Sequence, residues 1–196
     1  MNYQLIALLS FVLVGINQTI MGQSKKKLME VQQSIYIDIP QEELWKITAD
    51  DFIQVDKWIS GVNLAEGAGQ GIGAARTCTP SYRGFSKTTE KIIDFQPISS
   101  FTYEIIEGMP KMIAFATNTW KHEPQNEGTL MTMQVKMQVK GFMGTLMKGF
   151  MKKRMKSVLQ DALEELKLYA ETGELHKRKT AAMRKFESKA PLAGQR

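Results

Sequence analysis

Within residues 129–140 (TLMTMQVKMQVK), apolar and polar side chains alternate from Met131 onwards. A period of two is typical of a β-strand that buries one face and leaves the other in water, as strands of antiparallel sheets do. Directly afterwards, residues 142–171 change to apolar spacings of three and four, which predict one long amphipathic helix. Because sheet and helix each have one apolar face, we expect the helix to cover the sheet.

The preceding chain supplies the other strands. Residues 28–39 predict a first strand that stops at Pro40, followed by a helix over 41–52 and a second short helix or turn over 53–60. Several strand-like segments then follow as far as residue 123, and strands this close in sequence form an antiparallel meander. The predicted fold class is therefore α+β. We expect a curved antiparallel sheet of about seven strands, wrapped around a long C-terminal helix, with two short helices after the first strand.

Glycine and proline mark the turns of this meander. Residues 96–100 (QPISS) and 124–128 (PQNEG) predict turns between strands, and Gly173 is suited to ending the long helix. Residues 67–73 contain four glycines, but they lack the lysine and hydroxyl pair of a phosphate-binding loop and they lead into a strand. We interpret them as a turn that needs backbone freedom.

Composition narrows the chemistry. The chain is 43% hydrophobic, so a core can be buried, and its one cysteine, Cys78, excludes a disulfide framework. We predict that Cys78 is a small core residue and that His122, which lies next to a turn, is on the surface. We find no set of nucleophile, base and orienting group in the sequence. No catalytic residue, metal or cofactor is therefore expected.

The N-terminus is apolar over residues 5–16 (LIALLSFVLVGI), and three lysines follow at 25–27. The run suits the core of a secretory signal better than a membrane span, although no lysine or arginine precedes it. Three interpretations stay open: a signal peptide over 1–24 that is cleaved from a secreted or periplasmic protein, a membrane anchor over 5–22, and a buried amphiphilic extension.

Positive charge is concentrated at the other end. The net charge is +6, and residues 174–196 alone hold seven basic and two acidic side chains. We predict a solvated, frayed and disordered tail there, with attraction to anionic lipid as the alternative. Nucleic acid is not an expected partner, because exposed aromatic residues do not alternate with the basic ones.

Several local motifs occur in a familiar order. They are IDIP at the end of the first strand, QEELWKIT with Trp45, the segment VNLAEGAGQGIGAART, YEIIEG, and Trp120 followed by HEPQNEGTLMTMQV. Together they resemble the START-like group, which includes the plant pathogenesis-related allergens and the polyketide cyclase/dehydrase (SRPBCC) proteins. The resemblance spans residues 28–172, within a predicted domain over 28–173. It implies a helix-grip fold with a hydrophobic cavity for lipids, sterols, polyketides or similar ligands.

Thirteen methionines are an unusual excess. Methionine is flexible and polarizable, so it either fills the core or lines a cavity that adapts to its ligand, and the resemblance favours the cavity. We expect a monomer that binds or carries a hydrophobic small molecule. The alternatives are a cyclase or dehydratase acting on a polyketide-like substrate, and a regulatory subunit if side chains fill the cavity. The expected lining residues are Trp58, Tyr103, Phe115, Met133, Met147 and Met151.

The start of the C-terminal helix combines apolar and basic residues in the sequence GFMGTLMKGFMKKRMK. Such a segment is typical of a helix that lies on a membrane surface. We therefore expect Phe150, Lys152 and Lys153 to contact anionic bilayers.

Overall fold

A computed structural model describes residues 28–82 and 86–188. The predicted signal or anchor segment lies outside these residues and stays a prediction. In chain order, the elements are β1 (Leu28–Ile37), α1 (Gln41–Trp45), η1 (Lys46–Asp50), η2 (Phe52–Lys57), β2 (Val62–Ala68), β3 (Ala75–Pro80), β4 (Thr88–Gln96), β5 (Ser100–Glu107), β6 (Ile113–Gln125), β7 (Gly128–Val139), α2 (Gly141–Leu146), α3 (Lys148–Thr172) and α4 (Lys177–Glu187). None of the helices among the described residues is long and apolar enough to cross a membrane.

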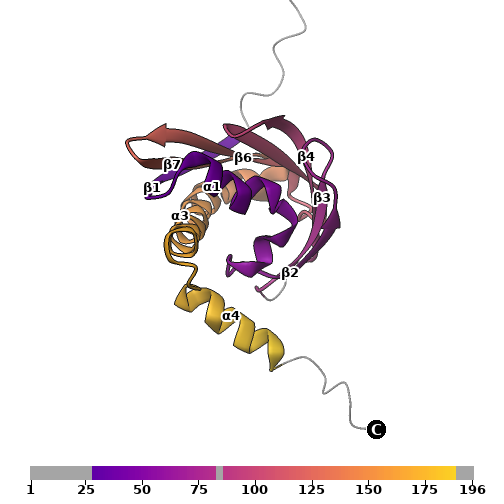
Figure 1. Cartoon of the computed structure of the whole chain (residues 1–196). Coiled ribbons are helices and arrows are strands. Elements are labelled where there is room, and N and C mark those ends of the chain that lie inside the picture. Colours follow the sequence, from indigo (N-terminus) through magenta and orange to yellow (C-terminus); the bar gives the residue numbers. More distant parts are fainter. Residues whose placement is uncertain (1–27, 83–85, 189–196) are drawn as a thin grey trace, which may run out of the picture.

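The strands of the described chain form one antiparallel sheet in the order β1-β7-β6-β5-β4-β3-β2. This order is the predicted meander, and in addition β1 pairs with β7 along the whole length of β1. Figure 1 shows the sheet arching from β1 round to β2, with α3 beneath β1 and β7. The predicted α+β helix-grip fold, with seven strands and a long C-terminal helix, is confirmed.

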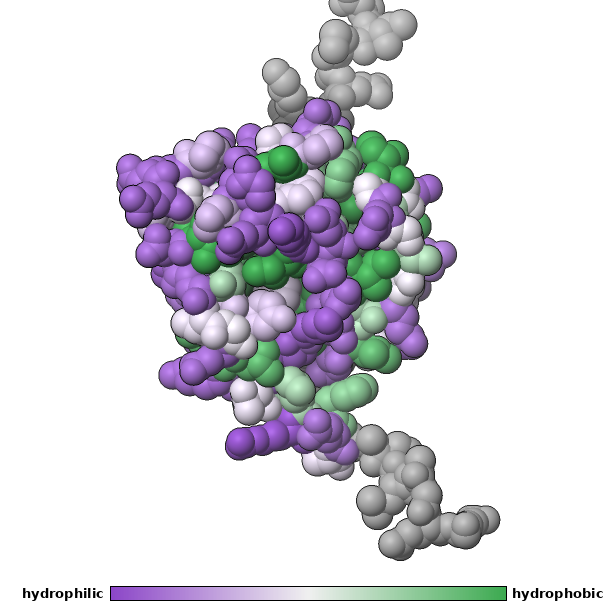
Figure 2. Space-filling model, viewed as in Figure 1, coloured by the Kyte–Doolittle hydropathy of each residue, from purple (hydrophilic) through white to green (hydrophobic). Residues whose placement is uncertain are grey.

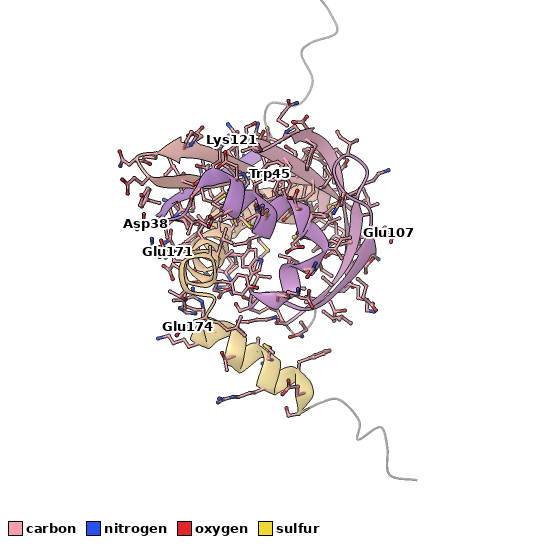
Figure 3. The ribbon with its side chains drawn as sticks, viewed as in Figure 1. Asp38, Trp45, Glu107, Lys121, Glu171 and Glu174 are labelled. Atoms are coloured by element: carbon pink, nitrogen blue, oxygen red, sulfur yellow. The ribbon has the colours of Figure 1, made fainter. Side chains whose placement is uncertain are left out.

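The alternation in β7 is confirmed for its apolar face. Its inward side chains are all buried, and they are Met131, Met133, Val135, Met137 and Val139. The outer face of the sheet is mainly polar, although Ile93 on β4 and Ile106 on β5 are exposed. Figure 3 shows Lys121 and Glu107 pointing away from the molecule, whereas Trp45 points from α1 into the core. Figure 2, which has the view of Figure 1, shows hydrophilic residues over much of the visible surface, with apolar residues in separate patches between them.

Two turns have specific backbone requirements. Asn126 and Glu127 connect β6 to β7, and Asn126 takes a positive φ of 53°, which suits the tight turns of β-hairpins. At the end of β2, a Cβ on Gly67 would lie 2.1 Å from the carbonyl oxygen of Ala75. In the connection from β2 to β3, Gly69, Gly71 and Gly73 take positive φ values of 94°, 63° and 86°, so this turn needs backbone freedom, as predicted.

The helix expected over residues 142–171 is divided in two. Met147, with φ of −82° and ψ of −3°, separates α2 from α3. Glycines at 144 and 149 flank this junction, and each costs up to about 1 kcal/mol relative to alanine within a helix. The predicted end is confirmed, because Gly173 adopts the left-handed conformation and its N–H donates to the carbonyl of Tyr169.

The prediction of a disordered tail is wrong for residues 177–187, which form α4. The cause is a cluster of carboxylates on α3. Arg178 forms salt bridges with Asp161, Glu164 and Glu165, at 3.4, 3.0 and 2.7 Å. Glu165 is only 1% exposed and also accepts hydrogen bonds from Ser60.

A second cation holds α4 against the sheet. Lys179 is 2% exposed, and its Nζ donates to the carbonyl of Val62 in β2. Burial lowers the pKa of Lys179, and nearby Asp56 and Glu165 oppose that shift. Two of the basic side chains that we assigned to a solvated tail, Arg178 and Lys179, therefore form contacts within the fold.

Replacing Arg178 by methionine should lower the free energy of unfolding by about 2 kcal/mol, because the buried Glu165 carboxylate loses its cation and keeps only Ser60. Urea unfolding measures this change. The matched control is Arg184→Met on the exposed side of α4, which should change stability by less than about 0.5 kcal/mol. Equal effects of the two substitutions would contradict the role assigned to Arg178.

Candidate functional site

A cavity with two chambers lies between the sheet and α3. The helix packs mainly on β1 and much less on β7, so the sheet surface farther along, over β5 and β6, is left partly uncovered. The inner chamber has a volume of about 200 Å³ and the outer one about 510 Å³. Met137, Met155 and Val158 line both, so the two chambers meet at these side chains.

The inner chamber is lined by β5, β6, β7 and α3. Its remaining lining residues are Ile59, Tyr103, Ile105, Ala116, Thr117, Asn118, Trp120, Met133, Val135, Leu159 and Ala162. Most of these are apolar and buried. Ala116 and Ala162 are small residues on β6 and α3, and they help to leave the space open.

The outer chamber lies between the start of α3 and the connection from β5 to β6. Besides the shared residues, Tyr82, Pro110, Met112, Ile113, Phe150, Met151 and Arg154 line it. The guanidinium of Arg154 lies 5.9 Å from the centre of the Tyr82 ring, a cation–π contact at the edge of the chamber. The lining is otherwise apolar.

Three polar side chains face one another on adjacent strands in the inner chamber. Asn118 Nδ2 donates a hydrogen bond of 2.9 Å to the hydroxyl of Tyr103. The carbonyl oxygen Oδ1 of Asn118 and the indole N–H of Trp120 are buried and have no hydrogen-bond partner in the described part of the chain. Burial raises the pKa of Tyr103, and the charge of Glu90 raises it further. The phenol is therefore neutral at neutral pH and retains its proton as a donor.

A buried ion pair lies beneath Tyr103. Arg76 is 3% exposed, bonds Glu90 at 2.7 Å and also donates to the carbonyl of Phe52. Its guanidinium lies 3.9 Å from the centre of the Phe52 ring and 5.2 Å from that of Tyr103. Because Glu90 and Phe52 already occupy it, Arg76 supports the wall of the cavity.

Cys78 is buried in the core, as predicted. Burial raises the pKa of its thiol to about 12, and the nearby Glu90 carboxylate adds to that shift. The thiol is therefore protonated at neutral pH, which makes it a poor nucleophile.

The surface position predicted for His122 is wrong. The imidazole is 1% exposed, its Nε2 lies 2.7 Å from Thr48 Oγ1, and the Trp45 and Phe101 rings pack against it. His122 is two residues after Trp120 in β6, so both side chains point to the same buried face. This spacing of two residues from Trp120 was the signal in the sequence that His122 is buried. His122 lines neither chamber.

The structure brings only some of the expected lining residues together. Tyr103 and Met133 line the inner chamber, and Met151 lines the outer one. Trp58 is buried, with its ring 6.0 Å from that of Trp120. Met147 and Phe115 are half-buried and line neither chamber.

Trp58, Phe115 and Met147 are the three exceptions, and the last two have simple causes. Phe115 precedes Ala116, which lines the inner chamber, and successive side chains of a strand point to opposite faces. Met147 occupies the junction between α2 and α3 that the expected continuous helix did not contain. The sequence analysis did not identify Asn118 as a lining residue. Asn118 is two residues before Trp120, so both side chains point to the same, inward face of the strand.

Apolar side chains are exposed beside the outer chamber. Phe142 and Leu146 on α2 and Phe150 on α3 are 80%, 68% and 67% exposed. Lys152 and Lys153, which we expected at a membrane surface, are exposed on the first turns of α3. Among the residues the structure describes, no group of three or more His, Cys, Asp or Glu side chains is placed to hold a metal ion.

Residues 29–171 match the model of a family described as "Polyketide cyclase / dehydrase and lipid transport". No curated protein sequence matches the chain.

Solved structures of other proteins share the fold at low sequence identity. A Thermus thermophilus protein has a TM-score of 0.59 at 20% identity, over 79% of this chain and 99% of its own. Norcoclaurine synthase from Thalictrum flavum has 0.60 at 15%, over 74% and 98%. The di-domain ARO/CYC StfQ from the steffimycin biosynthetic pathway has 0.63 at 13%, over 74% of this chain. The chain spans about half of the length of StfQ, 51%.

The folded protein should lose stability in acid through His122. Burial lowers its pKa from 6.5 to about 4, so between these values the unfolded chain binds a proton that the folded chain does not. Stability is full above pH 6.5 and falls as the pH drops towards 4, by up to about 3 kcal/mol. Urea unfolding across this interval measures the loss.

The His122→Phe variant should show a much flatter pH dependence over the same interval. His176→Asn is the control, because it keeps a side chain able to cap α4 and leaves His122 in place. If His122→Phe retained the full loss of stability in acid, another group would be responsible.

Proposed function

The chain belongs to the polyketide cyclase/dehydrase and lipid transport family of the START-like (SRPBCC) superfamily, and we propose that it binds a hydrophobic small molecule in the two-chambered cavity. The observation that carries the proposal is the cavity itself. Its walls are almost entirely apolar, methionines line both chambers, and it lies between the sheet and α3. A cavity with apolar walls binds apolar molecules in preference to water, because removing an apolar molecule from water is favourable.

Burial alone supplies enough free energy to retain such a ligand. Each methylene transferred from water contributes about 0.8 kcal/mol. A ligand with about a dozen buried methylenes would gain on the order of 10 kcal/mol before the costs of ordering it. Carriage therefore needs no catalytic group.

The second candidate is a cyclase or dehydratase. Its support is the polar group of Tyr103, Asn118 and Trp120 inside the inner chamber. Acid–base chemistry works best with a group whose pKa lies near the working pH. Among the residues that the structure describes, those that line the two chambers include no carboxylate and no imidazole, and Tyr103 holds its proton tightly. We therefore favour binding over catalysis.

Filling the inner chamber should weaken binding. Ala162 lines it from α3, and Ala162→Met places a larger side chain in the ligand's space, which should reduce affinity about tenfold. The control is Ser157→Met on the exposed side of the same helix, which should leave affinity unchanged. Native mass spectrometry of the purified protein, followed by solvent extraction, identifies any ligand and gives its occupancy.

Wild-type protein that carries no extractable ligand, and that binds neither alkanes nor alkanols in titrations, would contradict the proposed function. So would equal binding by wild type and Ala162→Met. The first result would favour the interpretation as a regulatory subunit.

We further propose that α2 and the first turns of α3 contact an anionic membrane, from which the ligand enters. Phe150 is both exposed and part of the outer chamber's lining, so this surface lies at the chamber's mouth. The exposed Phe142 and Leu146 provide apolar area, and Lys152 and Lys153 provide charge. Apolar insertion combined with attraction to anionic lipid is the usual basis of interfacial binding.

Reversing two charges, Lys152→Glu with Lys153→Glu, should weaken binding to vesicles containing phosphatidylserine by at least about tenfold, since each lysine near such a surface contributes about 1 kcal/mol. Vesicle co-sedimentation measures this. The control is Lys91→Glu with Lys121→Glu on the outer face of the sheet, which should bind as the wild type does. Binding that is unchanged by the first pair and by salt would contradict the membrane contact.

A further inference from the structure

The polar groups of the inner chamber are unusual because the protein leaves them unsatisfied. Buried hydrogen-bonding groups in native proteins nearly always have partners, and an exception calls for an explanation. Here Asn118 Oδ1 and Trp120 Nε1, both on β6, are buried without partners, and both residues line the inner chamber. The simplest explanation is a ligand that supplies the missing hydrogen-bond partners.

The hydrogen-bonding capacity of the group can be counted. Asn118 Nδ2 donates to Tyr103 Oη, so the phenol accepts from the amide and keeps its own proton to give. The indole N–H of Trp120 can only donate, and Asn118 Oδ1 can only accept. These three groups therefore offer two donors and one acceptor, besides Thr117, which also lines the chamber.

The three groups lie on one wall. Tyr103 on β5 and Asn118 on β6 are direct partners in the sheet, and Trp120 is two residues farther along β6 on the same face. The opposite side of the chamber consists of apolar residues of α3, Leu159 and Ala162 among them. A ligand that occupies the chamber therefore meets a small polar area within apolar surroundings.

We propose that the inner chamber recognises an uncharged hydroxyl group at the leading end of an otherwise apolar ligand. A hydroxyl accepts from Trp120 and Tyr103 and donates to Asn118, which matches all three groups at once. It also reproduces the bonds of a water molecule, so it can displace one from this wall without loss. This inference rests on the proposed function and specifies the class of its ligand.

Charged ends fit less well. A carboxylate has no proton to give to Asn118 Oδ1, and the buried cation nearest to the chamber wall, Arg76, is already held by Glu90 and the Phe52 carbonyl. An ammonium group would face the donors of Trp120 and Tyr103, and no carboxylate lines the chamber among the described residues. An ether accepts hydrogen bonds but leaves Asn118 unpaired.

The test compares dodecanol, dodecyl methyl ether and dodecanoate, with binding followed by calorimetry and by the change in tryptophan fluorescence. Wild-type protein should bind dodecanol about threefold to tenfold more tightly than the ether, because one buried hydrogen bond distinguishes them. Dodecanoate should bind more weakly than dodecanol. A ratio near one, or a preference for the ether or for dodecanoate, would overturn the inference.

Two conservative variants remove the polar groups one at a time. Asn118→Leu removes the acceptor that only dodecanol can use, so it should reduce the preference for dodecanol to less than about twofold while leaving affinity for the ether at least as high. Tyr103→Phe removes a donor that both oxygens accept from, so it should weaken the binding of dodecanol and of the ether alike and keep their ratio. The control is Thr102→Val, which removes a hydroxyl that bonds Thr119 on β6, next to Tyr103 in sequence; it should keep the preference.

Thermal unfolding of the ligand-free variants provides a second readout. Asn118→Leu removes a buried, unpaired carbonyl, so its Tm should equal or exceed that of the wild type. A purely structural Asn118 would instead lower the Tm and leave the dodecanol preference intact, which would overturn the inference. Failure of the wild type to bind any of the three probes would contradict the proposed function itself.

Discussion

The packing of α3 on a curved sheet is the constraint on which the rest of the structure depends. The helix has one apolar face, and most of its contact with the sheet is with β1, which pairs along its full length with β7. A straight helix cannot follow the concave surface of the whole sheet, so the part over β5 and β6 is left partly uncovered. Small side chains at Ala116 and Ala162 leave that space open, and methionines surround it.

Charged and polar groups inside this apolar frame divide into two kinds. Arg76 with Glu90, and Arg178 with Glu165, are pairs whose members are mutually bonded, and they hold β3 to β4 and α4 to α3. Such groups are costly to separate, because removing one member leaves the other charge without its partner. Asn118 and Trp120 differ, because each retains an unused hydrogen-bonding atom within the cavity wall. His122 Nδ1 is also buried without a partner in the described part of the chain, but His122 lines neither chamber, so only the atoms of Asn118 and Trp120 combine unused capacity with a place in the cavity wall.

Local patterns predicted the elements well and their contacts less well. The period of two in residues 129–140, the turn at 124–128 and the helix end at Gly173 all depend on neighbouring residues, and all are confirmed. The family resemblance supplied the expectation of a cavity. His122 was misplaced because proximity to a turn was given more weight than its parity with Trp120. The tail was misplaced because the charges of residues 177–187 were treated as solvated, while their partners on α3 lie 13 to 17 residues away in sequence.

By itself, the sequence determined the antiparallel meander, the final amphipathic helix and the apolar character of the surface between them, because hydrophobic periodicity is a local property of the chain. Only the tertiary structure decided which side chains line the two chambers, that α4 is docked by Arg178 and Lys179, and that Asn118 and Trp120 lack partners. Those facts depend on strand register, on the break at Met147 and on the distance between elements. Each of these is set by packing among residues that are far apart in the chain.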